Sequence, residues 1–462
     1  MDGSLQPSPE EFGAVMEQLT AFAEQVLSSG PPASDFSGIH ELLAELDEAE
    51  PARGELPELL DLLTRASAKG MNHLHPGFLA YIPVAGAPVN AVADFVAALL
   101  NRYVGVQWAS PTMAQLEWNV VRWLAAMFGY PEEARGVLTS GGSFANFTAL
   151  VTARHARLGA GHLQGAIYQT DQAHMSVERA ARLAGVDPAL VRFVATDDGL
   201  RMDVDALEEA IEADVSRGIE PFLVVLSAGT TNSGAVDPIV DAARVARASG
   251  AWVHVDAAYG GAFVLTEHGR EVMRGIDEAD SITFDPHKGL FSSMGLGCVL
   301  VRDGEAMRRA HMGEHAYLQP AGQPGLPPNL SDYSMELTRP FRGLRLWLAL
   351  KLYGWEPFRQ ALELNRQLAV DLHRALVADD RYEAPWAPQL STVVFRDAGG
   401  DEATERLLEG VNADGRVLLS STRMRDRLWL RACFLSHRTD RATLEDLLDA
   451  LGMSGAQPPG AG

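Results

Sequence analysis

Lys288 and Asp256 are the residues of this chain whose types and positions predict a definite chemistry. Lys288 lies in a tight Asp-Pro-His-Lys-Gly turn, residues 285–289, directly after the short apolar run Ser281–Phe284. Asp256 ends another apolar run, Trp252–Val255, and small residues follow it. A lysine amine can hold an aldehyde as a Schiff base, and a carboxylate can keep a pyridine nitrogen protonated. A lysine and an acid at two strand ends are therefore what a pyridoxal phosphate site needs.

Three further polar segments follow short apolar runs, where a doubly wound sheet collects its ligands. Residues 139–143, Thr-Ser-Gly-Gly-Ser, precede a helical stretch, so their N–H groups and the helix dipole suit a phosphate. His174 precedes the helical stretch 175–183, and a flat imidazole can stack on a planar ring. Residues 229–234, Gly-Thr-Thr-Asn-Ser-Gly, offer hydroxyl groups to a ligand oxygen. Each segment also has an ordinary structural interpretation, as a capped turn, a satisfied histidine or a glycine-rich turn.

A serine hydrolase is the first competing hypothesis. Residues 141–145, Gly-Gly-Ser-Phe-Ala, resemble the strand-to-helix elbow that carries a nucleophilic serine. Ala145 stands where that elbow has its last glycine, and the hypothesis leaves Lys288 without a role. The partners it needs are an acid and a histidine later in the chain, either Asp332 or Asp426 together with His437.

Two other interpretations explain less of the chain. Asp256 and Lys288 could form a plain ion pair, since an unpaired buried charge is costly, but this accounts neither for the small residues nor for His287. Residues 311–315, His-Met-Gly-Glu-His, match the spelling of a zinc motif. Their helical context is short and no convincing third ligand follows, so we predict no metal site.

From residue 91 the chain alternates helical stretches with short apolar runs. The runs are 136–139, 166–169, 191–195, 222–227, 252–255, 281–284 and 297–301. Most are apolar throughout rather than alternating, which favours a mostly parallel α/β sheet covered on both faces. A Pro/Gly-rich loop at 319–328 separates this part from a helical stretch at 341–376, and strand-like runs at 391–395 and 427–433 indicate a smaller α+β portion.

Three helical stretches without intervening strands precede the sheet. The first begins with Ser8, Pro9 and Glu11 in the pattern of a capping box, and others are expected over 38–48 and 56–68. Such helices must pack on something else, and a partner subunit would serve. We therefore expect an N-terminal helical dimerisation segment at 1–86, a large cofactor-binding domain at 87–344 and a small C-terminal domain at 345–462.

Composition excludes several function classes. The formal charge is −23, which disfavours binding to nucleic acid or to an anionic membrane. No run reaches the roughly 18 apolar residues of a membrane helix. Two cysteines cannot form a disulfide scaffold, and the first residues lack the basic and apolar regions of a signal peptide. We expect a cytoplasmic protein.

Taken in order, the segments resemble the group II pyridoxal-phosphate-dependent amino-acid decarboxylases of fold type I, and among them the aromatic L-amino-acid decarboxylases. The matching segments run from His73 to about Arg438. They include 75–76, 81–83, 107–111, 116–117, 139–146, 171–180, 229–231, 254–258, 285–288, 332–333 and 342–347.

The resemblance implies a role for each matching residue. Lys288 would carry the Schiff base and Asp256 would pair with the pyridine nitrogen. His174 would stack on one face of the ring and Ala258 would press on the other. The remaining cofactor residues would be Gly142 and Ser143 at the phosphate, His287 and Asp285 beside them, and Thr231 near the ring or the substrate carboxylate.

The resemblance also implies a reaction, the decarboxylation of an L-amino acid to an amine and CO2. Tyr317, before the Pro/Gly-rich loop, matches the tyrosine that protonates Cα from a mobile loop in the family. Relatives that form an aldehyde instead tend to carry phenylalanine there. An aldehyde synthase, or another reaction of the same cofactor, is the alternative.

The implied substrate pocket differs from the aromatic-specific pattern. Its residues are Leu74, Tyr81, Ile82, Pro83, Val84, Val104 and Val106, the last two expected from the neighbouring subunit of a homodimer. Leu74 stands in place of a tryptophan, so the pocket stays apolar and loses aromatic walls. Apolar pockets discriminate weakly, by about 1–3 kcal/mol per methylene. We expect an aromatic substrate first and a branched aliphatic one as its competitor, and an acidic one is disfavoured.

Overall fold

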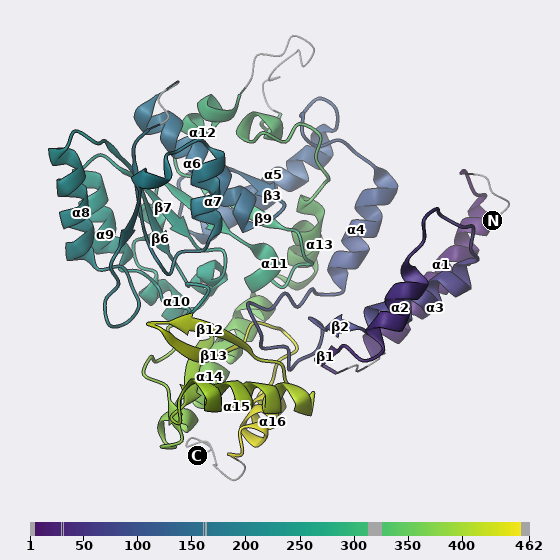
Figure 1. Ribbon diagram of the computed structural model, residues 1–462. Coiled ribbons are helices and arrows are strands. Elements are labelled where there is room, and N and C mark those ends of the chain that lie inside the picture. Colours follow the sequence, from purple (N-terminus) through teal and green to yellow (C-terminus); the bar gives the residue numbers. More distant parts are fainter. Residues whose placement is uncertain are drawn as a thin grey trace.

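A seven-stranded sheet forms the centre of the larger part of the molecule, in a computed structural model that describes residues 5–28, 30, 32–159, 161, 164–312 and 326–453 (Figure 1). Its strands are β3 (Arg135–Thr139), β4 (Ala166–Thr170), β5 (Val191–Val194), β6 (Pro221–Ser227), β7 (Trp252–Asp256), β8 (Ser281–Phe284) and β9 (Gly297–Val301). Their order is β3-β9-β8-β7-β6-β4-β5. β9 runs antiparallel to both neighbours, and the other pairs are parallel. The predicted mostly parallel sheet is confirmed, and each predicted run is a strand.

The two faces of this sheet are covered by different helices. Side chains alternate between the faces along a strand, so Trp252 and Val253 belong to different cores. The face of Trp252 packs against α6 (Gly142–Leu158), α7 (Ser176–Leu183) and α12 (Gly304–His311). The opposite face packs against α5 (Pro111–Met127), α8 (Val204–Ser216), α9 (Ile239–Ala248) and α13 (Gly343–Tyr353). Burial on both sides explains why the strands read as continuous apolar runs.

Two shorter helices and α4 complete this part. α4 (Val89–Leu100) packs against α13, and α10 (Glu267–Val272) follows a 3-10 turn at Gly260–Leu265. Residues 285–289 were expected to form a tight turn, and they form the one-turn helix α11 (Pro286–Gly289) instead. Proline is preorganised for the first helical position, which explains the helix.

A four-stranded antiparallel sheet forms the C-terminal part, as the predicted α+β portion requires. Its order is β10 (Tyr382–Glu383), β11 (Thr392–Asp397), β13 (Arg427–Cys433) and β12 (Ser420–Met424). The helices of this part are α14 (Glu356–Val377), α15 (Asp401–Asp414) and α16 (Arg441–Ala450). α14 joins two cores, because Leu362 packs with the large sheet and Leu368 with the small one. The division into 1–86, 87–344 and 345–462 stays our proposal.

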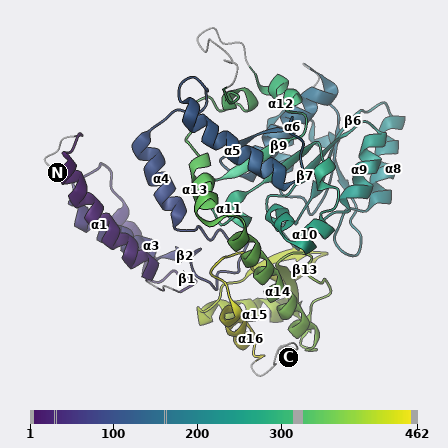
Figure 2. The ribbon, with the colours of Figure 1, turned by 180° about the vertical axis from the view of Figure 1, so that it is seen from behind.

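The N-terminal helices project from the rest of the molecule (Figures 1 and 2). They are α1 (Pro9–Ser28), α2 (Ile39–Leu46) and α3 (Leu56–Ser67), with a short pair of strands, β1 (Ser34–Asp35) and β2 (Gly70–Met71), at their base. The predicted capping box is present: the N–H of Glu11 donates to Ser8 Oγ at 3.2 Å, and the N–H of Ser8 donates to Glu11 Oε2 at 2.9 Å. None of the described side chains of these three helices is buried within the chain.

Within the described ranges, no helix has both the length and the apolar character needed to cross a bilayer.

Candidate active site

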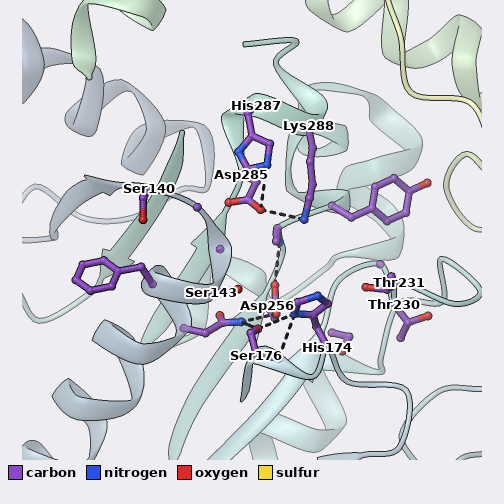
Figure 3. Close-up of a pocket in the computed structure, with 18 of the residues that line it drawn as sticks. Ser140, Ser143, His174, Ser176, Thr230, Thr231, Asp256, Asp285, His287 and Lys288 are labelled. Atoms are coloured by element: carbon purple, nitrogen blue, oxygen red, sulfur yellow. Dashed lines mark hydrogen bonds and ion pairs between the residues drawn. The ribbon is translucent and has the colours of Figure 1, made fainter. Parts of the chain in front are cut away.

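A cavity of about 430 Å³ opens where β3, β6, β7 and β8 end. The segments that follow parallel strands meet at one edge of a sheet, and these segments supply its lining. Figure 3 shows Asp285, His287 and Lys288 on one side of the cavity and Asp256, Ser176 and His174 on the other. Every residue predicted to hold the cofactor lines this cavity: Gly142, Ser143, His174, Thr231, Asp256, Ala258, Asp285, His287 and Lys288.

Lys288 is paired with Asp285 across one turn of α11. Its Nζ lies 2.9 Å from Asp285 Oδ2, and the carboxylate is nearly inaccessible to solvent. Burial by itself lowers the pKa of Lys288, but the charge and hydrogen bond of Asp285 outweigh it, so the pKa is raised above its ordinary value. Lys288 is therefore an ammonium group in this arrangement, with its proton shared toward Asp285.

Asp256 ends β7 and is held on both oxygens. Its Oδ2 accepts a hydrogen bond from Asn146 Nδ2 at 2.7 Å, and its Oδ1 accepts one from the N–H of Ala258 at 3.1 Å. The side chain is 8% exposed and borders the cavity. Asp256 is thus a nearly buried acceptor whose orientation is fixed by two donors.

The predicted phosphate loop joins β3 to α6. Gly142 and Ser143 begin α6, so their N–H groups have no acceptor within the helix. A side chain at position 142 would meet Asp285 Oδ2 at 2.9 Å and the Cβ of Ala258 at 3.3 Å. The absence of a side chain there keeps the space between the helix N-terminus and α11 open to an anion.

The two histidines of the cavity are held in different ways. His174 Nδ1 lies 2.7 Å from Ser176 Oγ and accepts the N–H of Ser176 at 3.2 Å. His287 Nδ1 lies 2.6 Å from the carbonyl of Leu296, so this nitrogen carries a proton and donates. Desolvation lowers the pKa of both rings, against the opposing charges of nearby carboxylates. Both are neutral at neutral pH.

Thr231 borders the cavity beside a residue that the sequence did not indicate, Arg431. The Arg431 guanidinium, on a side chain 3% exposed, donates to the carbonyls of Thr231, Asn232 and Tyr81. It thereby ties the loop after β6 to the Tyr81 segment. A lone arginine within the otherwise apolar end of a strand was the signal that could have revealed it.

Asn146 and Ser176 also line the cavity and were not predicted as site residues. Asn146 lies one helical turn after Gly142, so it faces the same side of α6. That spacing was the available signal.

None of the seven predicted substrate residues, all of which the structure describes, is among the residues that line this cavity. Tyr81 has φ 53° and a side chain 53% exposed, with its N–H donating to Ser420 Oγ at 2.9 Å. Ile82, Pro83 and Val84 follow it, and Leu74 lines a second cavity next to the N-terminal helices. Val104 and Val106 are 0% and 2% exposed, so both pack against their own chain. The substrate role of this set stays a prediction. Tyr317 lies outside the described residues.

The elbow-like serine, Ser143, lines the cavity, but the partners considered below and the described residues of the zinc-like motif are not among its lining residues. His437 packs against the ring of Phe291 at 5.4 Å, and Asp426 lies in the turn between β12 and β13, so neither approaches Ser143 in the cavity. His311 ends α12 with Nε2 3.0 Å from Thr152 Oγ1. Residues 313–315 of its zinc-like motif lie outside the described residues.

The groups present fit a phosphorylated aldehyde such as pyridoxal phosphate. The cavity volume falls in the usual range for small-molecule sites. The phosphate of this molecule fits a helix N-terminus that no side chain blocks. Its aldehyde fits a lysine amine, and its ring nitrogen fits a buried carboxylate acceptor.

Comparison with known proteins identifies the family. The model of the pyridoxal-dependent decarboxylase conserved domain matches residues 40–398. An aromatic-L-amino-acid decarboxylase of Bacillus atrophaeus is 34% identical over 435 residues, covering 91% of this chain and 89% of that protein. A histidine decarboxylase of Drosophila melanogaster is 32% identical over 427 residues, covering 87% of this chain and 50% of that protein. The crystal structure of Oryza sativa TDC with PLP and tryptamine matches with a TM-score of 0.88 and 27% identity, covering 97% of this chain and 98% of that one.

Sequence family, fold and cavity therefore agree: the chain belongs to the pyridoxal-dependent decarboxylases, in the group of the aromatic amino-acid decarboxylases, and it is a carboxy-lyase that uses pyridoxal phosphate.

Proposed function

We propose that the protein converts an aromatic L-amino acid into the corresponding amine and CO2. The observation that carries the reaction type is one cavity that contains Lys288, Asp256 and His174 together. Overall similarity does not select the substrate, because relatives of 34% and 32% identity are named for aromatic amino acids and for histidine. The apolar set of Leu74, Ile82 and Val84 favours an uncharged side chain.

We propose that the cofactor is held by the residues that the sequence indicated. When bound, pyridoxal phosphate supplies an electron sink for the electron pair that departing CO2 leaves on Cα. Gly142 and Ser143 would bind its phosphate and Lys288 its aldehyde carbon. Ala258 and His174 would hold the ring, with Thr231, Asp285 and His287 at its edge.

Lys288 must lose a proton before its nitrogen can bind an aldehyde carbon. Asp285 Oδ2, at 2.9 Å from Nζ, is the nearest acceptor for that proton. The exchange leaves a neutral amine and a neutral carboxyl, and it avoids an ionised Asp285 beside a phosphate. Asp285 would therefore both orient Lys288 and receive its proton.

Asp256 would accept a hydrogen bond from the protonated ring nitrogen. Two donors fix the orientation of its carboxylate, and a carboxylate that faces the ring nitrogen favours the protonated nitrogen. Tyr317 would then donate a proton to Cα, which completes amine formation. Without that donor, oxidation by O2 to an aldehyde would compete with amine formation.

Amine and CO2 release from purified protein tests the proposal. The protein is incubated with each standard amino acid, and both products are measured. We expect release from tryptophan, tyrosine or phenylalanine, and a yellow colour that borohydride removes. Lys288→Ala should be colourless and inactive. Preference for a branched aliphatic amino acid would replace the substrate assignment, and aldehyde as the main product would contradict the proposed reaction.

A further inference from the structure

Asn146 connects two groups of the cavity through one buried amide. Its side chain is 3% exposed, and Nδ2 lies 2.7 Å from Asp256 Oδ2 and 2.9 Å from Ser176 Oγ. Its Oδ1 lies 3.0 Å from His254 Nε2. The amide therefore uses both N–H groups and its oxygen, each on a different partner (Figure 3 shows the Asp256 and Ser176 side of this network).

The direction of each hydrogen bond follows from the carboxylate. The carboxylate of Asp256 accepts from Asn146, so Asn146 presents its NH2 group to Asp256 and its oxygen to His254. His254 must then carry its proton on Nε2. Burial lowers the pKa of His254 to about 4, so the ring is neutral and Nδ1 is an acceptor.

A chain of donors on β7 and β8 supports this arrangement. His254 Nδ1 lies 2.8 Å from Ser281 Oγ, and the indole N–H of Trp252 donates to the same oxygen at 2.8 Å. Because an indole only donates, the Ser281 hydroxyl is free to donate to His254. Trp252, His254 and Asp256 alternate along β7 and so share the face that packs against α6.

The second N–H of Asn146 determines the state of His174. Ser176 Oγ accepts from Asn146, so its own O–H donates to His174 Nδ1 at 2.7 Å. The N–H of Ser176 donates to the same nitrogen. A nitrogen that accepts two hydrogen bonds carries no proton, so the His174 proton is on Nε2.

We propose that Asn146 is a positioning residue of the cofactor site: its single amide fixes the carboxylate of Asp256 as a hydrogen-bond acceptor and, through Ser176, keeps the proton of His174 on Nε2. The inference rests on the proposed roles of Asp256 and His174. It adds a coupling between Asp256, which would face the pyridine nitrogen of the cofactor, and His174, which would stack on the face of the cofactor ring. The titratable groups around Asp256 are His254 on β7, His174 before α7 and Lys288 on α11.

The proposed effect of Asn146 on Asp256 is tested by measuring the affinity for pyridoxal phosphate in the absence of substrate. Asn146→Leu keeps the approximate shape and removes the donor, and loss of one hydrogen bond to a charged group should weaken pyridoxal phosphate binding about 10- to 100-fold. Asn146→Asp places a second carboxylate beside Asp256. Its affinity should be weak at neutral pH and improve as pH falls and one carboxylate takes up a proton, a profile that a merely structural role would not produce.

Asn119→Leu is the matched control. Asn119 lies on the remote helix α5, where its Oδ1 accepts a hydrogen bond from Gln115 Nε2 at 2.8 Å, and the variant should bind the cofactor like the unmodified protein. Equal affinity in Asn146→Leu and the unmodified protein, or a flat pH profile in Asn146→Asp, would overturn the proposal. Should Asn146→Leu not fold, Asn146→Asp carries the same test.

The proposed position of the His174 proton is tested by nitrogen-15 NMR of histidine-labelled protein, a measurement that needs no catalysed reaction. The His174 signals, assigned by their loss in His174→Gln, should show an unprotonated Nδ1 and a protonated Nε2. A proton on Nδ1 would refute the assignment. A protein that binds the cofactor with these properties but releases no amine from any amino acid would refute the proposed function and leave this inference standing.

Discussion

His254 lies on β7 and faces α6, and 2% of its surface is exposed. This burial makes the stability of the fold depend on pH. Desolvation lowers its pKa to about 4, despite the opposing charge of Asp256, whereas the ring in an unfolded chain titrates near 6.5. Between pH 4 and pH 6.5 the unfolded state therefore binds more protons at this residue than the folded state does. The free energy of unfolding should therefore fall as pH drops from 6.5 toward 4, by up to about 3 kcal/mol from this residue.

Urea unfolding at pH 7.5 and at pH 4.5 measures this effect. His254→Gln keeps an N–H donor for Asn146 and cannot titrate, so its midpoint should change less between the two pH values. An identical pH dependence in the variant and the unmodified protein would show that other groups cause the loss.

Tyr317 carries the prediction about product choice. Tyr317→Phe removes the proposed proton donor, so amine formation should slow by about 100-fold or more, the usual contribution of a general acid. In the presence of oxygen, aldehyde and hydrogen peroxide should rise. Quantifying amine, aldehyde and peroxide from one reaction checks this. An unchanged ratio of products would remove Tyr317 from the mechanism.

At the scale of elements, the start of β9 supports the phosphate loop. A Cβ at Gly297 would lie 2.5 Å from the carbonyl carbon of Gly141 and 2.6 Å from its Cα. Carbon atoms do not approach so closely without a shift of backbone. Gly297→Ala should therefore displace the loop before α6 and weaken cofactor binding about 10- to 100-fold, because displacements near 1 Å have effects of that size. Fluorescence titration with pyridoxal phosphate measures the change.

Gly410→Ala is the control for Gly297→Ala. Gly410 lies within α15, and a Cβ there has no neighbour within 4 Å. The substitution should leave cofactor affinity unchanged and raise stability by about 0.5–1 kcal/mol, because alanine is the better helix former. Equal affinity of the Gly297 and Gly410 variants would mean that β9 does not constrain the loop.

At the scale of the whole molecule, the N-terminal helices expose apolar side chains that the single chain does not cover. Leu43, Leu59 and Leu63 are 55%, 45% and 55% exposed on helices without a buried residue. Apolar faces of this kind mark surfaces for association. We propose that they pack against a second copy, in a homodimer of the cytoplasm, consistent with a substrate set that one chain leaves dispersed.

Sedimentation equilibrium tests the dimer. The protein should have twice the mass of the chain, and Leu63→Asp should shift it toward the single chain because a charge would be buried at the interface. Glu58→Gln, on the same helix and already exposed, is the control and should leave the mass unchanged. A single-chain mass for the unmodified protein would refute the dimer.

The sequence by itself determined the sheet and the chemistry at its edge. Runs such as Trp252–Val255 and the one in Pro221–Ser227 predict buried strands because both faces of a parallel sheet exclude water. Polar residues placed directly after such runs, including Lys288 and Asp256, must converge at the carboxyl edge. Local pattern and topology were enough to bring to one cavity the residues that we propose hold the cofactor.

Only the tertiary structure decided which other side chains contact the residues of the cavity. Asn146 meets Asp256 across 110 positions and Arg431 meets Thr231 across 200, and no local spacing encodes either contact. The helix at 286–289 also depended on context, because a proline begins turns and helices alike. Substrate choice belongs to this second kind of information, because the residues that we propose for the substrate pocket, Leu74, Tyr81 and their neighbours, could form one only through packing that the chain order does not specify.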